Sequence, residues 1–162
     1  MSDIIKVAIP IVGEEEIQAV AEVLRSGRYV QGPKVKEFEE KFAEYIGTKY
    51  AVATNSGTAA LHIALAAAGI GPGDEVIVPP LTFFATIEAV LHQNAIPIFA
   101  DIDPETCTLD PEDVSKRISK RTKAIIPVHL FGHPAEMDPI MELAEDHNLI
   151  AVSYTHLTLP TT

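Results

Sequence analysis

The chain has 162 residues, of which 47% are hydrophobic and 22% charged, as is ordinary for a soluble globular domain. Acidic residues outnumber basic ones by 23 to 12, for a net charge of −11, so we do not expect a nucleic-acid partner. The single cysteine excludes an internal disulfide, and the absence of a signal-peptide pattern or long apolar run predicts a cytoplasmic protein with no membrane partner.

The first part of the chain predicts two helices. Residues 14–26 place apolar side chains at helical spacing, with acids in the first turn and Gly27 after the last residue. Pro33 suits the first turn of a second helix, which ends before Gly47. We assign residues 1–48 to an N-terminal helical segment.

From residue 49 onward, short apolar strands alternate with helices. The predicted strands are 51–54, 75–78, 96–100, 124–128 and 149–152, and the predicted helices are 59–68, 83–93, 110–118 and 137–147. This alternation indicates an α/β fold with a mostly parallel sheet that helices cover on both faces, over residues 49–152. Residues 153–162 continue no pattern, and we expect them to be a disordered or foreign tail.

The segment from Asn55 to Ala59 lies between a predicted strand and a predicted helix. A helix N-terminus offers unpaired N–H groups and a partial positive charge, so it suits a phosphate. Gly57 permits close approach, and the hydroxyls of Ser56 and Thr58 can donate further hydrogen bonds. Simple capping of the helix by Ser56 or Thr58 would explain the same residues.

Two adjacent aromatic residues, Phe83 and Phe84, follow the next predicted strand. Ligands of α/β proteins bind at the carboxyl ends of strands. One ring can therefore cover a flat ligand while the other packs into the core. The alternative is that both rings belong to the core.

The remaining polar residues indicate no metal site. Asp101 and Asp103, which precede Pro104, favour a turn over a metal-binding carboxylate pair. Cys107 is explained as a small apolar filler. His62, on the predicted helix 59–68, is explained as a packed or solvated residue, and His133 and His147 show no metal-ligand spacing.

Four segments in series resemble one known family, the DegT/StrS family of pyridoxal-phosphate (PLP) dependent sugar aminotransferases. They are Gly32-Pro33-x-Val35-x-x-Phe38-Glu39, Asn55-Ser56-Gly57-Thr58-Ala59-Ala60-Leu61, Gly71-Pro72-Gly73-Asp74-Glu75-Val76-Ile77-Val78-Pro79 with Thr82-Phe83, and Arg121 to Gly132. The resemblance covers residues 6–152 or so. It implies the large domain of the aspartate-aminotransferase-like fold, in truncated form.

The resemblance also implies the roles of particular residues. Gly57, Thr58 and Ala59, together with Ser56, would hold the PLP phosphate, and Phe83 would stack on the pyridine ring. His129 would fall near the cofactor, although a strand-end histidine bonded to the backbone explains it equally well. The loop at Gly32 is similar to one near the active site, where family members pair as homodimers.

The activity that the resemblance implies is transfer of an amino group from glutamate to a nucleotide-linked keto-sugar, for amino-sugar or polysaccharide biosynthesis. No catalytic residue can be assigned, because the family's acidic segment is replaced by Ser153-Tyr154-Thr155-His156 and no lysine follows Lys123. We therefore expect this chain alone to be inactive.

Three alternatives remain. A PLP-dependent sugar dehydratase of the same family has histidine in place of the lysine, and that position lies outside the chain. A non-catalytic regulatory protein could have kept the PLP-type domain. An unrelated nucleotide-binding module would need a Gly-x-Gly-x-x-Gly or Walker loop, and neither occurs.

Overall fold

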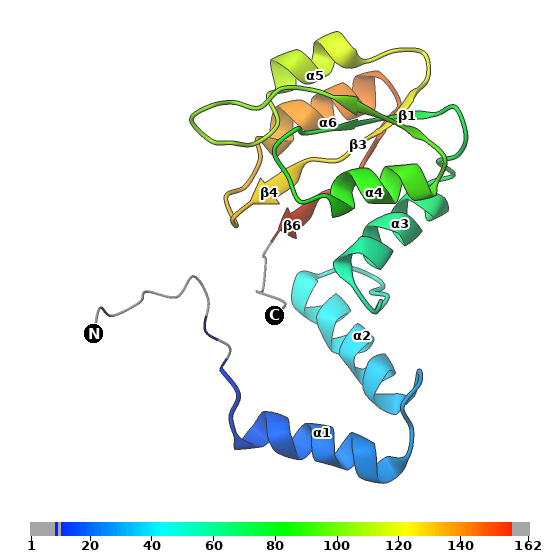
Figure 1. Ribbon diagram of the computed structural model, residues 1–162, viewed down its shortest axis with the longest axis vertical. Helices are drawn as coiled ribbons and strands as arrows, with labels where there is room; N and C mark the ends of the chain where they lie inside the picture. Colours follow the sequence, from blue (N-terminus) through cyan, green and yellow to red (C-terminus); the bar gives the residue numbers. More distant parts are fainter. Residues whose placement is uncertain (1–8, 10, 157–162) are drawn as a thin grey trace. The chain divides into compact units, whose positions relative to one another are not determined.

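The computed structural model describes residue 9 and residues 11–156 (Figure 1). The chain divides into two compact units between Ala53 and Thr54, five residues after the predicted boundary at 48/49. Each unit is considered by itself. Among the described residues, no helix combines the length and apolar character needed to cross a membrane.

The N-terminal unit contains the two helices that the sequence predicts. Helix α1 spans Glu14–Ser26 and helix α2 spans Pro33–Ile46. Each ends at a glycine in the left-handed conformation, Gly27 with φ 67° and Gly47 with φ 81°, because a glycine pays no Cβ penalty there. Local sequence therefore determines both helix ends.

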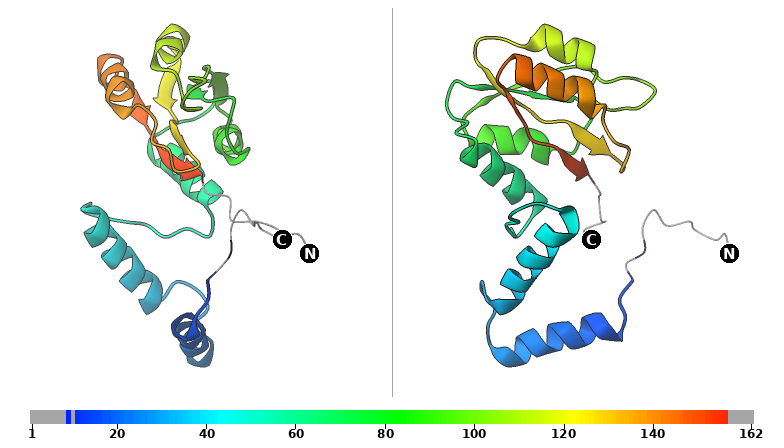
Figure 2. Two further views of the ribbon diagram at one scale, coloured as in Figure 1. Left: turned by 90° about the vertical axis from the view of Figure 1, so that its left-hand side faces the viewer. Right: turned by 180° about the vertical axis from the view of Figure 1, so that it is seen from behind.

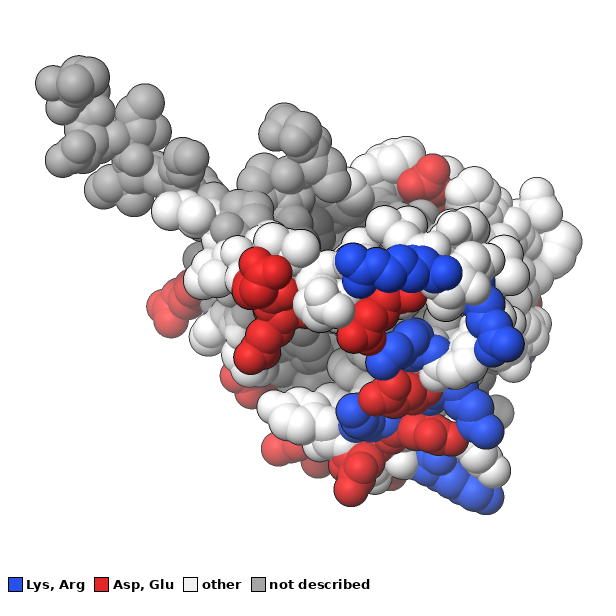
Figure 3. Space-filling model, turned by 90° about the horizontal axis from the view of Figure 1, so that it is seen from below, with Lys and Arg blue, Asp and Glu red and all other residues white. Residues whose placement is uncertain are grey.

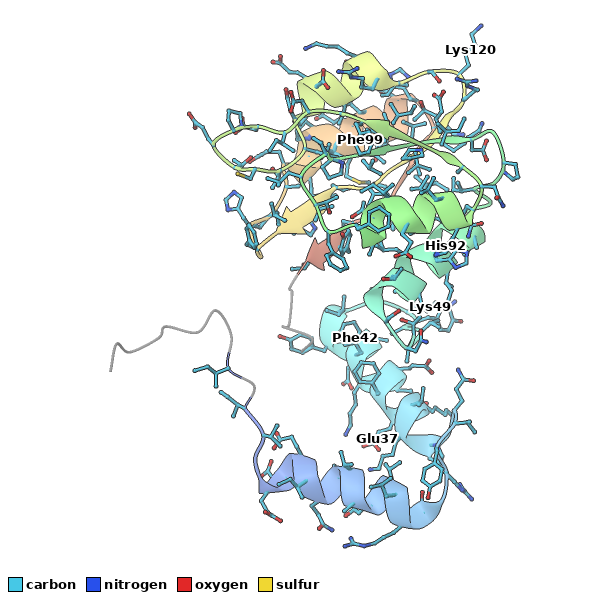
Figure 4. The ribbon with its side chains drawn as sticks, in the orientation of Figure 1. Glu37, Phe42, Lys49, His92, Phe99 and Lys120 are labelled. Atoms are coloured by element: carbon cyan, nitrogen blue, oxygen red, sulfur yellow. The ribbon has the colours of Figure 1, made fainter. Side chains whose placement is uncertain are left out.

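Ion pairs one turn apart reinforce α2. The Nζ of Lys41 lies 2.8 Å from an Oε1 of Glu37, and the Nζ of Lys34 lies 3.3 Å from its Oε2. Figure 4 labels Glu37 on this helix, and Figure 3 shows basic and acidic side chains beside one another on the face that it draws. Solvent screens such exposed pairs, so they adjust helix stability slightly rather than create a site.

The second unit alternates strands and helices as the sequence predicts. Its elements are α3 (Gly57–Ala67), β1 (Glu75–Val78), α4 (Ala85–His92), β2 (Ile96–Phe99), α5 (Pro111–Arg117), β3 (Thr122–Ile125), β4 (Val128–Leu130), α6 (Met137–Asp146), β5 (Ile150–Ala151) and β6 (Tyr154–His156). Four strands form a parallel sheet in the order β2-β1-β3-β5, with Ile77 opposite Ile98 and Ile125. The predicted α/β class is confirmed.

Alternate residues of β1 serve two separate cores. Val76 and Val78 are fully buried in a cluster with residues of α3 and α4, whereas Ile77 is buried in a cluster with residues of α5 and α6. Figure 1 shows the two helix pairs on opposite faces of the sheet, and Figure 2 shows the same layers from other sides. Burial on both faces explains why the strand is apolar throughout.

One predicted strand is absent. Residues 51–54 have no strand conformation, and Val52 is 73% exposed. A strand exists only through hydrogen bonds to a neighbour, and within the described residues this segment has no neighbouring strand. The prediction was wrong because an apolar run cannot show whether a pairing partner is present.

A second difference lies at Pro127, which divides the predicted strand 124–128 into β3 and β4. Proline has no N–H to donate to a sheet. Beyond it, β4 pairs in parallel with β6, with Val128 opposite Tyr154. Part of the expected tail is therefore an ordered strand, and the rest of that tail, residues 157–162, lies outside the described residues.

Candidate cofactor-binding site

The predicted phosphate site is the first turn of α3. Ser56 is the N-cap residue, and its side-chain oxygen accepts a hydrogen bond of 3.1 Å from the N–H of Ala59. The carbonyl of Ser56 accepts another, of 3.0 Å, from Ala60. The predicted capping role of Ser56 is therefore real. A hydroxyl that accepts one hydrogen bond still has its own hydrogen to donate.

Two backbone donors remain in this turn after capping. Within the described residues, the N–H groups of Gly57 and Thr58 donate no hydrogen bond. Gly57 is exposed, and a Cβ built on it would meet nothing within 4 Å. Free amides at the positive end of a helix, beside an open surface, fit a phosphate dianion. Capping and phosphate binding are thus compatible here.

The aromatic pair lies just before α4, after β1. Phe83 is 50% exposed and Phe84 is 64% exposed. The alternative in which both rings belong to the core is therefore wrong, and so is the expectation that one of them packs there. A half-exposed ring at the carboxyl end of a strand can cover the face of a flat ligand.

Hydroxyl groups fix the backbone at Phe83. The Oγ1 of Thr86, which is fully buried, donates to the carbonyl of Phe83 at 3.1 Å. The hydroxyls of Thr82 and Thr86 lie 2.7 Å apart, and Tyr154 Oη is hydrogen-bonded to both. Because Tyr154 stands where the family resemblance calls for an acidic segment, the sequence did not reveal this network. The segment that carries Phe83 is consequently rigid.

His129 lies on β4, and its ring is bonded to the backbone. Its Nδ1 accepts a hydrogen bond of 3.0 Å from the N–H of Ala135, which confirms the structural alternative given above for this residue. The position of His129 relative to a cofactor stays a prediction.

The other singled-out residues have local partners. Asp103 accepts hydrogen bonds from the N–H groups of Glu105 and Thr106, as in a turn. The rings of His62 and His92 lie 5.3 Å apart between α3 and α4. No group of three possible metal ligands occurs in the part of the chain that the structure describes.

The strongest charge interaction of this unit lies at the amino edge of the sheet, away from α3's first turn. The buried carboxylate of Glu75 accepts hydrogen bonds from Ser119 Oγ and, at 2.9 Å, from Arg121 Nε. The hydrogen bond from Ser119 and the Arg121 guanidinium hold the pKa of Glu75 below its ordinary range, against the opposing effect of burial. Both oxygens of this carboxylate are therefore bonded to protein donors.

Known proteins resemble this chain over most of its length. The model of the DegT/DnrJ/EryC1/StrS aminotransferase family matches residues 10–154. GDP-perosamine synthase of Caulobacter vibrioides is 52% identical over 121 residues, which make up 75% of this chain and 33% of that protein. The dTDP-3-amino-3,4,6-trideoxy-alpha-D-glucose transaminase of Streptomyces venezuelae is 51% identical over 131 residues, 81% of this chain and 35% of that protein.

A solved structure shares the fold. A protein of Streptococcus pneumoniae described as a sugar aminotransferase, in its PLP-form, superposes with a TM-score of 0.82 at 37% identity, over 90% of this chain and 37% of that one. The chain thus spans little more than a third of the length of the proteins that it matches. On the family match and the shared fold, the chain belongs to the DegT/DnrJ/EryC1/StrS aminotransferase family.

Proposed function

We propose that this chain supplies the phosphate-binding part of a PLP-dependent aminotransferase that moves an amino group from glutamate to a nucleotide-linked keto-sugar. Family membership supports the reaction class, and the relatives named for GDP- and dTDP-linked amino sugars support the substrate class. The observation that carries the proposal is the pair of free amides, Gly57 and Thr58, at the start of α3.

The residues present fit the phosphate and one ring face of PLP. The amides of Gly57 and Thr58 would bind phosphate oxygens, and the hydroxyl of Ser56 would donate a further hydrogen bond. The ring of Phe83, on its fixed backbone, would cover the pyridine and exclude water from that face. When bound, PLP supplies an electron sink for the transfer of the amino group.

None of the described lysines is suited to bond covalently to the cofactor. All of them are exposed. Three lie on α2 and one on α5, Lys49 and Lys120 lie in loops, and Lys123 lies at the start of β3. We therefore propose that the 162-residue chain binds PLP without forming a covalent bond and has no transaminase activity by itself. Borohydride treatment of the chain with equimolar PLP should label no lysine in preference to the others in a peptide map.

The phosphate site is tested by Gly57→Asp. An acid in the first turn of a helix favours the helix, so folding should be kept, and the open space around Gly57 accepts the side chain. The added negative charge should repel the phosphate and weaken PLP binding about tenfold or more, since tenfold is only about 1.4 kcal/mol. Equilibrium dialysis with PLP measures the effect.

Gly71→Asp is the matched control. Gly71 also has open space where a Cβ would stand, and it lies beyond the opposite end of α3. It adds the same charge to the chain, but it should leave PLP affinity unchanged. Equal losses in the two variants would mean that net charge, and not the first turn of α3, controls binding, and the proposed site would be refuted.

A further inference from the structure

The turn that follows β4 has an unusual residue at its tip. Phe131 has φ 54° and Gly132 has φ 83°, and the N–H of His133 donates to the carbonyl of Leu130 at 2.9 Å. Positive φ at both central residues together with this hydrogen bond describes a type I′ turn. The second central residue is the usual glycine.

Phenylalanine is a poor choice for the first central position. The left-handed conformation there favours Asn, Asp or Gly, and for a bulky residue it is strained. No packing offsets the strain, because Phe131 is 79% exposed. The residues on either side hold the turn in place. His129, before the turn, accepts a hydrogen bond through Nδ1 from the N–H of Ala135, which follows the turn and is buried.

The place of Phe131 in the fold indicates what the ring does. It lies beyond the carboxyl ends of β3 and β4, and the other phenylalanines of this unit also lie at carboxyl ends of strands and are about half exposed or more: Phe83, Phe84 and Phe99. Ligands of parallel α/β sheets bind at this edge. A residue that breaks a local rule without internal gain is expected at a functional position.

We propose that Phe131 binds the nucleobase of the nucleotide-linked substrate by stacking, an inference that rests on the proposed function. A ring exposed to this extent suits a flat partner, and a base buries more of it than a puckered sugar does. Stacking is also tolerant of the base, because every base has a π face. That tolerance agrees with relatives named for both GDP- and dTDP-linked sugars.

The inference predicts opposite effects of Phe131→Asn on stability and on binding. Asparagine relieves the strained conformation, so the urea midpoint of the full chain should rise. Loss of the ring should weaken binding of dTDP roughly 5- to 150-fold. Isothermal titration with dTDP and urea unfolding measure the two effects, and a lower midpoint or an unchanged dTDP affinity would overturn the inference.

Cys107→Asn is the matched control. Cys107 is another non-glycine residue in the left-handed region, with φ 58°, in the loop between β2 and α5. Relief of strain there should raise the urea midpoint as well, but dTDP affinity should stay as in the unaltered chain. A comparable loss of dTDP affinity in this variant would show that the effect at Phe131 is not local, and would also overturn the inference.

Phe131→Trp provides a direct readout, because the chain contains no tryptophan. Its fluorescence should be quenched by dTDP and by GDP, and not by glucose. Quenching by glucose, or no quenching at millimolar dTDP, would refute base stacking. PLP binding without dTDP quenching would refute this inference alone, whereas dTDP quenching without PLP binding would refute the proposed cofactor site alone.

Discussion

The two edges of the β2-β1-β3-β5 sheet differ in chemistry. At the carboxyl edge the helices begin, two amides of α3 donate to no acceptor among the described residues, and phenylalanine rings are exposed. At the amino edge the helices end, Lys120 extends from the loop before β3, and Glu75 is bonded to Ser119 and Arg121 (Figure 4). Among the described residues, the amides of Gly57 and Thr58 at the carboxyl edge have no protein acceptor, whereas the Glu75 carboxylate at the amino edge has protein donors.

This contrast follows from the direction of the chain. In a parallel sheet every connecting helix runs opposite to the strands, so positive helix ends gather at one edge and negative ends at the other. The cations at the amino edge complement the helix ends there. We therefore expect substitutions at the amino edge to change stability and substitutions at the carboxyl edge to change ligand binding.

The largest expected effect is at the amino edge. Glu75→Ala leaves the Ser119 hydroxyl and the Arg121 guanidinium without their acceptor and empties a buried position. Removing one partner of a buried pair costs about 3–5 kcal/mol, and because Arg121 is largely exposed we expect the lower end. Urea unfolding measures the loss. PLP affinity of the folded fraction should not change. A loss of PLP binding without a loss of stability would contradict the expected difference between the two edges.

The next effect is at the carboxyl edge. Phe83→Leu removes an aromatic ring that is half exposed, so the unfolding free energy should change by less than about 1 kcal/mol. PLP affinity should fall several-fold, because an aromatic pair contributes about 0.5–1.5 kcal/mol beyond the area it buries. Phe99→Leu, at the end of the edge strand β2, is the control. The prediction is wrong if both variants bind PLP alike.

The smallest effect concerns pH at the amino edge. Since the folded-state pKa of Glu75 lies below its ordinary value, its contribution to stability is present above that ordinary value, about 4.3, and is lost as pH falls through the folded-state pKa. Glu75→Gln should therefore flatten the decline in the urea midpoint as the pH is lowered from about 6 to about 3.

Some decline should remain in Glu75→Gln. The pKa of Asp113 is also lowered, first by the hydrogen bond from the Asp101 N–H and then by Arg117. Asp113 therefore also loses its contribution to stability as the pH falls. A variant that declines as steeply as the unaltered chain would show that Glu75 does not control the acid sensitivity of this edge.

Much of the candidate site could be read from the sequence, and part of it could not. The glycine after Ser56 and the strand-then-helix context predict a helix N-terminus suited to phosphate. Whether the amides of Gly57 and Thr58 keep free of protein acceptors depends on the packing around α3. The exposure of Phe83 and Phe84 likewise depends on distant residues, which is why the sequence favoured at least one buried ring.

The turn at Phe131 was missed altogether. The dipeptide Phe-Gly is a weak turn signal beside Asn-Gly, and the strain becomes visible only when φ is known. A signal did exist, since Phe131 and Gly132 belong to the fourth segment of the family resemblance. That signal indicated membership of the family and not the conformation of the residue.

By itself the sequence determined the helices α1 and α2 to their ends, α5 to within one residue at each end, the α/β class and the family. Those features depend on contacts within one turn, such as the cap of Asp110 on Glu112 and the glycines after α1 and α2, or on patterns that recur along the chain. The tertiary structure decided which apolar runs become strands, where Pro127 interrupts the sheet, and which phenylalanine rings are exposed. Each of these depends on residues far away in the sequence, and local sequence patterns do not specify where those residues lie in the fold.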